Sequence, residues 1–347
     1  MRMKRAISGL IGRAISEPAE KAISGLTKKA ISGLVGLLLV VAAGSAQAGS
    51  YPSKPIHVIV PYPAGGIVDI VTRAVTQEIG NQWGQSFVIE DKPGGSSNIG
   101  TAYVARSKPD GYTWLVTGPA VLVNPSIYSN AGWEPMRDFK TVGVFVWNQS
   151  VAVVPSSMPI KTMKEFVQYV KDHPDAVNWG NPGIGSSVDL TTHRLFQAAG
   201  INPNGIVYKG QPPALVDLIG GRLQFEIATL DLVESHIKSG SLRALATFTH
   251  KRIDSLPDVP TIAEAGYPKA TYVPWYGALV PAKTPPAVLK KINEGISQAL
   301  RTPKVHDLLA KVEMPGQPTS LDDLATLMKK DHARLTKVVR ESGEKIH

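Results

Sequence analysis

The 347-residue chain contains no cysteine. Without cysteine it has no disulfide, no thiolate nucleophile or metal ligand, and no lipid anchor on an N-terminal cysteine. Long apolar runs are scarce too: the uncharged run over 34–43 falls well short of the roughly 20 residues of a transmembrane helix. These absences favour an exported bacterial protein that folds without disulfides.

The first 48 residues have the pattern of an export signal. Seven basic side chains precede the apolar run 34–43, and Ala46-Gln47-Ala48 supplies the small residues of a signal-peptidase site. We therefore predict a signal peptide over 1–48, a mature chain that starts at Gly49, and a periplasmic protein. An uncleaved amphipathic membrane anchor is the alternative for this long basic leader.

Positive charge is concentrated in this leader. The whole chain has 37 basic and 28 acidic residues, a net charge of +9, whereas residues 49–347 carry 30 and 26, a net charge of +4. There is no stripe of clustered lysine and arginine with interleaved aromatic residues, so the sequence does not indicate nucleic-acid binding. A mild positive balance suits a small anionic ligand.

Motifs for catalysis are missing as well. The eight histidines are dispersed, without a His-x-x-His or His-Glu-x-x-His pair, and no Gly-x-Ser-x-Gly elbow is present. The run 95–101 has the glycine spacing of a P-loop but lacks its lysine, so a helix-capping turn is the better interpretation. We predict no catalytic residue, no metal and no cofactor.

A β-then-α rhythm occurs twice in the 299 residues after the leader, which are more than one compact core usually takes. Such alternation favours parallel sheets covered by helices. The predicted strands are 56–60, 86–90, 112–117, 176–180, 205–208, 223–228 and 242–248, and the helices among them are 67–83, 98–107, 162–173, 187–199, 212–220 and 231–238.

Two β-rich stretches, 142–154 and 272–280, lie where the chain would cross between two domains. Only helices follow, predicted over 286–301, 304–312 and 321–342. A chain that leaves one domain, builds a second and returns makes a double hinge. We therefore predict an α/β protein with two lobes around a central cleft. Domain 1 is predicted over 49–147 plus 273–347, and domain 2 over 148–272.

A glycine turn joins the first predicted strand to the first helix: Tyr62-Pro63-Ala64-Gly65-Gly66, followed by Asp69. Glycines permit a positive φ and close approach to the backbone, and a helix N-terminus presents N–H groups to an anion. Tyr62 is predicted to wall the pocket. For Asp69, a hydrogen bond to a ligand amine or hydroxyl and a favourable charge at a helix N-terminus are both open. An ordinary turn is the alternative for the whole run.

A second turn, Gly183-Ile184-Gly185-Ser186-Ser187, repeats this device in the other half. Ser186 or Ser187 is predicted to cap the helix, which leaves the other hydroxyl to reach a carboxylate. Ligands of such sheets bind beyond the carboxyl ends of the strands, so Gly118 and Tyr208, which end strands, are further candidates. Lys209 is either a cation near the cleft or a solvated lysine.

These segments give the chain a family resemblance. It resembles the solute receptors of tripartite tricarboxylate transporters, the Bug family of periplasmic binding proteins. The matching segments cover essentially all of 51–347: Tyr51-Pro52-Ser53-Lys54-Pro55-Ile56, Pro61-Tyr62-Pro63-Ala64-Gly65-Gly66 with Asp69, Lys92-Pro93-Gly94-Gly95 with Asn98-Ile99-Gly100, Pro109-Asp110-Gly111-Tyr112-Thr113, Tyr208-Lys209-Gly210 with Pro213-Ala214-Leu215, Asp217-Leu218 and Gly220-Gly221, and Leu256-Pro257-Asp258-Val259-Pro260-Thr261 with Glu264-Ala265-Gly266.

The resemblance implies a type II periplasmic-binding fold that closes on a small carboxylate held by backbone amides and ordered water. Carried onto this chain, the binding loops are 62–69 and 182–187. Asp189 departs from the family, in which many relatives carry histidine, and its charge is unfavourable beside an anion if it points inward. The predicted ligand-binding residues are Tyr62, Ala64, Gly65, Gly66, Asp69, Gly118, Gly185, Ser186, Ser187 and Tyr208.

The partners implied by the resemblance are a small organic carboxylate and the subunits of a membrane transporter. We predict a monomer that captures the carboxylate by hinge closure. Two alternatives share the same scaffold and stay open at this point: a ligand sensor for a membrane signalling partner, and a periplasmic hydrolase or lyase.

Overall fold

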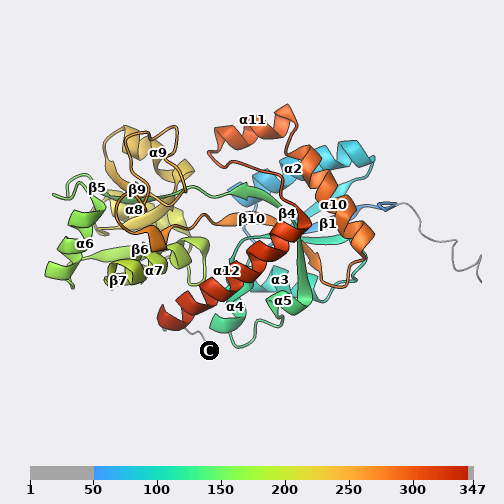
Figure 1. Cartoon of the computed structure of the whole chain (residues 1–347), viewed down its shortest axis with the longest axis horizontal. Coiled ribbons are helices and arrows are strands. Elements are labelled where there is room, and N and C mark those ends of the chain that lie inside the picture. The colour runs from blue at the N-terminus through green and yellow to red at the C-terminus, as the bar shows by residue number, and fades with distance from the viewer. Residues whose placement is uncertain (1–50, 343–347) are drawn as a thin grey trace, which may run out of the picture. The chain divides into compact units, whose positions relative to one another are not determined.

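The computed structural model describes residues 51–342, and the signal peptide predicted over 1–48 lies outside them. From Lys54 onwards the described chain is one compact unit that contains two groups of strands (Figure 1). Among its described helices, none is long and apolar enough to cross a membrane.

The first group is a five-stranded sheet in the order β2-β1-β3-β10-β4. Its strands are β1 (Ile56–Val60), β2 (Phe87–Asp91), β3 (Thr113–Thr117), β4 (Phe139–Trp147) and β10 (Trp275–Pro281). β1 is parallel to β2 and β3, whereas β10 runs antiparallel to β3 and β4. Four of the five β1 residues are buried, as expected for a β-branched strand covered on both faces.

Helices cover both faces of this sheet, and the sheet with these helices is called lobe 1. α2 packs against α10 and α11 on one side, while α12 packs against α4 and β4 on the other. The close packing uses glycine: a Cβ on Gly295 of α10 would lie 2.4 Å from the Trp83 ring of α2. The helices are α2 (Ile67–Trp83), α3 (Asn98–Ala105), α4 (Ala120–Ile127), α5 (Pro135–Asp138), α10 (Pro286–Ala299), α11 (Pro303–Lys311) and α12 (Leu321–Ser342).

The second group of strands, called lobe 2 with its helices, repeats the order of the first. Its sheets are β8-β5-β9 and β6-β7, and a parallel bridge between Trp179 and Phe225 joins β6 to the start of β8. The order β7-β6-β8-β5-β9 therefore matches β2-β1-β3-β10-β4, with β5 antiparallel to its neighbours as β10 is. The strands are β5 (Ser150–Pro155), β6 (Asn178–Asn181), β7 (Asn204–Val207), β8 (Glu226–Thr229) and β9 (Leu242–Thr247).

Lobe 2 has its own apolar core, in which the rings of Phe166 and Phe225 stack with centroids 4.3 Å apart. Thr162 caps its first helix: Thr162 Oγ1 accepts from the backbone N–H of Glu165 at 3.2 Å. The helices are α6 (Met163–Asp172), α7 (Ser187–Ala199), α8 (Gln211–Ile219), α9 (Leu230–Lys238) and the short 3₁₀ helix η1 (Pro268–Ala270).

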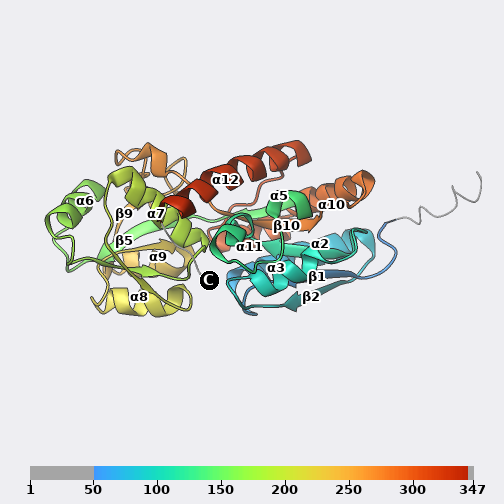
Figure 2. The ribbon, with the colours of Figure 1, turned by 90° about the horizontal axis from the view of Figure 1, so that it is seen from below.

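The chain crosses between the lobes twice, and helix α12 of lobe 1 also contacts lobe 2. The two crossing segments are bonded to each other, since the N–H of Asn148 donates to the carbonyl of Pro274 at 2.7 Å. α12 extends from lobe 1 to α7 (Figures 1 and 2), where Gln197 Nε2 donates to the carbonyl of Val338 at 3.3 Å.

The predicted elements are found within a few residues of their expected bounds, but the sheets differ from expectation and the short helices α4, α5 and η1 were not predicted. The sheets are mixed rather than parallel, because β5 and β10 enter each sheet from the other lobe and run in the opposite direction. Helix α4 was not predicted. It contains Pro125, which normally argues against a helix, but a proline in the second turn leaves most of the hydrogen-bond ladder of a short helix intact.

Candidate ligand-binding site

A cavity of about 780 Å³ lies at the carboxyl ends of the parallel strands of both lobes. In lobe 1 it is lined by segments 61–63, 93–97 and 119–120, which follow β1, β2 and β3. In lobe 2 it is lined by 182–187 and 207–210, which follow β6 and end β7. Its size and its position beyond the carboxyl ends of the strands are those of a small-molecule site in an α/β protein.

A second hollow, of about 940 Å³, lies at the opposite ends of the lobe 1 strands, around Lys54, His57 and Thr113. It is formed within one lobe and at the amino ends of β1 and β3, so we take the cavity shared by both lobes as the candidate site. No group of three or more histidine, aspartate or glutamate side chains in the described part of the chain is arranged to hold a metal ion.

The loop before α7 forms much of the lobe 2 wall. Gly185 has a φ of +78°, which glycine adopts without strain, and its N–H donates to Asp189 Oδ2 at 2.8 Å. Ser186 is the N-cap, and its Oγ accepts from the N–H of Asp189 at 3.2 Å. The sequence left Ser186 and Ser187 open as caps, and the structure assigns that role to Ser186.

Asp189 is fully buried beneath this loop and does not line the cavity. Besides the N–H of Gly185, it accepts from Asn181 Nδ2 at 2.7 Å, and His193 Nε2 lies 3.3 Å from its Oδ1. The Asp189 carboxylate, whose direction the sequence left open, therefore points into lobe 2. There it holds the loop in place rather than opposing an anion in the cavity.

The first turn of α7 leaves two backbone donors open. The N–H groups of Ser187 and Val188 have no hydrogen-bond partner in the described part of the chain, as expected for positions N1 and N2 of a helix. Ser187 lines the cavity, and its Oγ lies 3.4 Å from Tyr276 Oη. These donors and the positive end of the helix dipole favour an anion at this point.

The loop before α2 repeats the same geometry in lobe 1. Gly65 has a φ of +76°, and its N–H donates to Asp69 Oδ2 at 2.8 Å. Asp69 is buried, and its other carboxylate oxygen lies 2.6 Å from Arg73 Nε. Of the two roles that the sequence left open for Asp69, the observed bonds show a carboxylate at a helix N-terminus that stabilises its own turn.

The structure brings together half of the predicted binding residues at the cavity: Tyr62, Gly185, Ser186, Ser187 and Tyr208 line it. Ala64, Gly65 and Gly66 are exposed beside it and are not part of its wall, and Asp69 and Gly118 are buried behind it. Their contact with a ligand stays a prediction. The N–H groups of Gly65 and Gly66 already donate within the turn, to Asp69 and to the carbonyl of Pro63.

Two tyrosines meet at the boundary of the lobes. Tyr62 Oη lies 3.2 Å from Thr117 Oγ1 and accepts from the N–H of Gly118 at 3.3 Å. The rings of Tyr62 and Tyr276 pack edge to face with centroids 5.9 Å apart. Burial raises the pKa of both hydroxyls, so both stay neutral hydrogen-bonding groups at physiological pH.

Gly118 acts on the cavity through Tyr276. A Cβ at Gly118 would lie 2.9 Å from the Tyr276 ring, closer than such atoms approach, and in tight contact at 3.1 Å with the carbonyl of Trp275. Because Gly118 has no side chain, the Tyr276 ring fits against its backbone. Tyr276 was not predicted as a site residue, because it lies in an apolar strand far along the chain and no local motif marks it.

Tyr208 lines the cavity, but its hydroxyl bonds away from it. Tyr208 Oη donates to Asp217 Oδ2 of α8 at 2.7 Å, and partial burial together with this bond raises its pKa to about 12. The segment is held beside the α7 loop by two backbone bonds, from Tyr208 N–H to the carbonyl of Asn181 at 2.7 Å and from Gly210 N–H to that of Pro182 at 3.0 Å.

The loop 93–97 is a further part of the wall that the sequence assigned only to helix capping. Asn124 Nδ2 of α4 donates to the carbonyl of Ser96 at 2.7 Å, and Ser96 Oγ lies 2.6 Å from Tyr128 Oη. Tyr128 Oη also donates to the carbonyl of Ile184 at 3.5 Å, which joins the lobes across the cavity. Helix α4 and Tyr128 therefore hold this part of the cavity wall in place. The sequence analysis missed both, because neither carries a recognisable motif.

Comparison with known proteins identifies the family. The model of the tripartite tricarboxylate transporter family receptor matches residues 71–344. This chain belongs to that family. The periplasmic binding protein BugD is 30% identical, with a TM-score of 0.73 over 85% of this chain and 99% of that one.

Two related structures from Rhodopseudomonas palustris were solved with carboxylates. One, bound to adipate, is 29% identical with a TM-score of 0.74 over 84% of this chain and 98% of that one. The other, MatC with bound malate, is 28% identical with a TM-score of 0.72 over 83% of this chain and 100% of that one. The fold is thus the two-lobed periplasmic-binding-protein fold, and the family consists of solute-binding proteins rather than enzymes.

Proposed function

We propose that this protein captures a small organic carboxylate between its lobes in the periplasm and delivers it to the membrane subunits of a tripartite tricarboxylate transporter. One observation carries the proposal: the α7 turn with the two open N–H groups begins at Ser187, on the wall of a cavity shared by both lobes. The family description as a transporter receptor and the adipate and malate of its relatives support it.

The ligand carboxylate binds at the N-terminus of α7 in this proposal. The N–H groups of Ser187 and Val188 donate to its oxygens, and the Ser187 hydroxyl supplies a third donor. The site is pre-organised, because Asp189 and Ser186 already fix the turn through three hydrogen bonds and binding does not have to order it. Tyr62 and Tyr276 cover the carboxylate from lobe 1.

Closure of the lobes completes the site. The chain crosses at 147–150 and again at 272–275, and these segments serve as the hinge between domain 1 (49–147 plus 273–347) and domain 2 (148–272). The exposed turn at Ala64–Gly66 stands beside the cavity next to Tyr62 and moves toward the ligand as the lobes close. In that turn the N–H of Ala64 is free of partners among the described residues.

Two substitutions at one position test the carboxylate contact. Ser187→Pro removes both the backbone N–H and the hydroxyl, and proline is well tolerated at the first position of a helix. The preceding residue, Ser186, already has φ −66° and ψ 162°, which a following proline accepts. Ser187→Ala is the matched control, since it removes the hydroxyl and keeps the N–H.

Binding is measured by thermal shift and calorimetry against a panel of mono- and dicarboxylates, with turnover of each acid followed in parallel. We expect at least one acid to raise the melting temperature without being consumed. Ser187→Pro should then weaken its binding about tenfold or more, and Ser187→Ala less, as expected for loss of a charge-assisted hydrogen bond. If no acid of the panel stabilises the protein, or if an acid is consumed, the proposal fails.

A further inference from the structure

Exposed apolar side chains gather on two equivalent strand–helix units, one in each lobe. Of the nine large hydrophobic side chains that are exposed in the described part of the chain, seven lie on β2 and α3 of lobe 1 or on β7 and α8 of lobe 2. These units correspond, because β2 and β7 are edge strands at the same position of the two matching sheet orders, and α3 and α8 follow them in the chain. Single exposed hydrophobic residues are ordinary, whereas a concentration of them marks an interaction surface.

In lobe 1 these side chains form the α3 patch, which consists of Val88, Ile99 and Tyr103. Ile99 and Tyr103 are 60% and 51% exposed, and their spacing of four residues places them on one side of α3, a helix without a charged residue. Val88 of β2 points to the same side of the sheet as α3. Its neighbour Phe87 packs on Trp83 of α2, which covers the opposite face.

In lobe 2 the α8 patch is the solvent face of α8 together with the exposed Ile206 and Val207 of β7. The exposed residues of α8 are all apolar: Pro212, Pro213, Val216 and Ile219. An ordinary surface helix turns polar residues to the solvent, and α6 of the same lobe does so with Lys164, Glu165, Gln168, Lys171 and Asp172. The apolar face of α8 is therefore not explained by the packing of lobe 2.

Both patches begin at the ligand cavity. The loop 93–97 leads into α3, the loop 207–210 leads into α8, and both loops line the cavity. Figure 2 shows α8 and the β2–α3 unit in the lower part of the two lobes, on the side away from α12. A change in the angle between the lobes changes the spacing of the two patches. One partner that contacts both patches can therefore distinguish the closed, ligand-bound protein from the open one.

Cations lie at the ends of both helices. Arg106 and Lys108 follow α3, and Lys209 precedes α8. All three side chains are exposed, and none forms an ion pair with a residue that the structure describes. Their charges are free to pair with a partner. The complementary surface is therefore apolar, with carboxylates along its edge.

We propose that the α3 and α8 patches together are the docking face for the membrane subunits of the transporter, which meet it with an apolar surface edged by acidic side chains. This inference rests on the proposed function, in which a transporter receptor hands its ligand to those subunits. Anionic lipid is the competing occupant, because exposed apolar residues and cations also suit a membrane surface. Matching patches on two moving lobes favour the protein. Its surface has a fixed spacing that one lobe arrangement fits, whereas a fluid lipid surface fits any.

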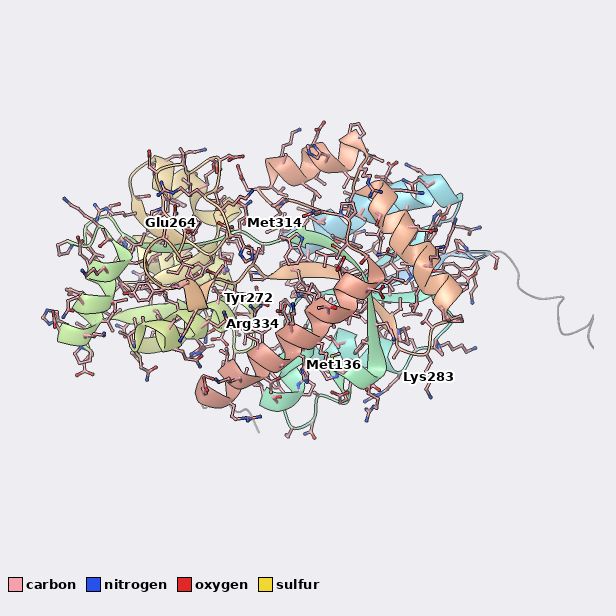
Figure 3. The ribbon with its side chains drawn as sticks, in the orientation of Figure 1. Met136, Glu264, Tyr272, Lys283, Met314 and Arg334 are labelled. Carbon is pink, nitrogen blue, oxygen red and sulfur yellow. The ribbon has the colours of Figure 1, made fainter. Side chains whose placement is uncertain are left out.

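Uptake of the carboxylate into cells that contain the full chain and the membrane subunits tests both halves of the face. Tyr103→Glu changes the α3 patch and Val216→Glu the α8 patch, at positions exposed enough to accept a charge. Met136→Glu is the matched control, because Met136, labelled in Figure 3, is 44% exposed on α5 and belongs to neither patch. The carboxylate affinity and melting temperature of each purified variant are measured alongside.

We expect Tyr103→Glu and Val216→Glu each to lower uptake about tenfold or more, with carboxylate affinity and melting temperature unchanged. Arg106→Glu should lower uptake as well, and Met136→Glu should not. If a glutamate variant does not fold, the alanine variant at the same position replaces it. Full uptake with either patch changed overturns the inference, as does an equal loss in Met136→Glu. If the wild type binds no carboxylate and supports no uptake, the proposed function fails instead.

Liposome binding distinguishes the membrane subunits from lipid. The carboxylate-loaded protein is mixed with liposomes that contain the purified membrane subunits, and with liposomes of the same anionic lipids without them. We expect binding to the first kind alone, reduced in Tyr103→Glu and in Val216→Glu but not in Met136→Glu. Equal binding to both kinds assigns the patches to lipid and overturns the inference, and so does binding to neither.

Discussion

The backbone N–H of Gly185 donates a 2.8 Å hydrogen bond to the buried carboxylate of Asp189. The pair Gly65 and Asp69 repeats this bond at the same length in the other lobe. In both loops the glycine has a positive φ and lies two residues before the first residue of the helix. The aspartate is the third residue of that helix. The acids that follow the two glycine turns therefore stabilise the turns themselves.

Asp189→Ala should lower the free energy of unfolding by about 3 kcal/mol, because it leaves the buried N–H of Gly185 and the amide of Asn181 without an acceptor. The loop that carries Ser187 should loosen, so carboxylate affinity should fall as well. Urea unfolding and calorimetric titration measure the two effects. Asp175→Ala, at an exposed position before β6, is the control. A loss of stability no larger than that of the control would contradict the structural role.

Gly118→Ala should displace Tyr276 from the cavity, since the added methyl group would meet its ring at 2.9 Å. Overpacking of this kind costs about 1–3 kcal/mol, and the moved ring should weaken ligand binding. Gly220→Ala is the control: this glycine ends α8 with φ −73°, and its Cβ would come no closer than 3.3 Å to another atom. The double variant Gly118→Ala with Tyr276→Leu should recover stability. No recovery would mean that the clash lies elsewhere.

Glu226 gives the protein a pH-dependent stability. It is fully buried at the start of β8, neither carboxyl oxygen has a hydrogen-bond partner in the described residues, and burial raises its pKa to about 8. Between the ordinary value near 4.5 and about 8, the folded state holds this proton and the unfolded state does not. The free energy of unfolding therefore falls as the pH rises through this range.

Glu226→Gln should remove this dependence. In urea unfolding of the wild type, the free energy of unfolding should fall between pH 5 and 9, and Glu226 should account for on the order of 4 kcal/mol of that fall. The variant should lack this part of the pH dependence. At pH 9 the variant should be the more stable protein. Parallel pH profiles for the two proteins would show that the carboxyl group is not the source.

In the second segment that crosses between the lobes, Tyr272 lies between an arginine of each lobe. Arg334 of α12, labelled beside Tyr272 in Figure 3, has its Cζ 4.8 Å from the ring centroid, and Cζ of Arg194 of α7 lies 5.6 Å from it. Arg334 also donates to the buried Asp331 at 2.5 Å, while Trp275 Nε1 donates to the same carboxylate at 3.1 Å. Burial raises the pKa of Asp331, with Arg334 opposing that effect.

Arg334→Gln should destabilise the protein by about 2 kcal/mol, because it leaves Asp331 buried with only the Trp275 donor. Adding Asp331→Asn should recover part of that loss, since the remaining group is then neutral. A double-mutant cycle from urea unfolding gives the coupling energy. Strictly additive losses would show that the two side chains do not act as a pair.

The local elements and the family follow from the sequence. Helix and strand periodicity placed nearly every element, and Gly65 and Gly185 marked turns that adopt the expected positive φ. The short motifs spread in order over 51–347 carried the resemblance that the family match confirms. Each of these signals depends on residues that are close together in the chain. They can therefore be predicted from the sequence without knowledge of the tertiary structure.

The tertiary structure alone decided which groups face the ligand cavity. Tyr276 and Tyr128 reach it from elements far from the glycine turns, and Asp69 and Asp189 turn away from it because each bonds a backbone N–H of its own loop. The direction of an isolated acid or lysine depends on where distant strands place its neighbours, and no local pattern encodes this. For the same reason the sequence left Lys209 open as a cation near the cleft or a solvated lysine, and only the folded chain places it on the cavity wall.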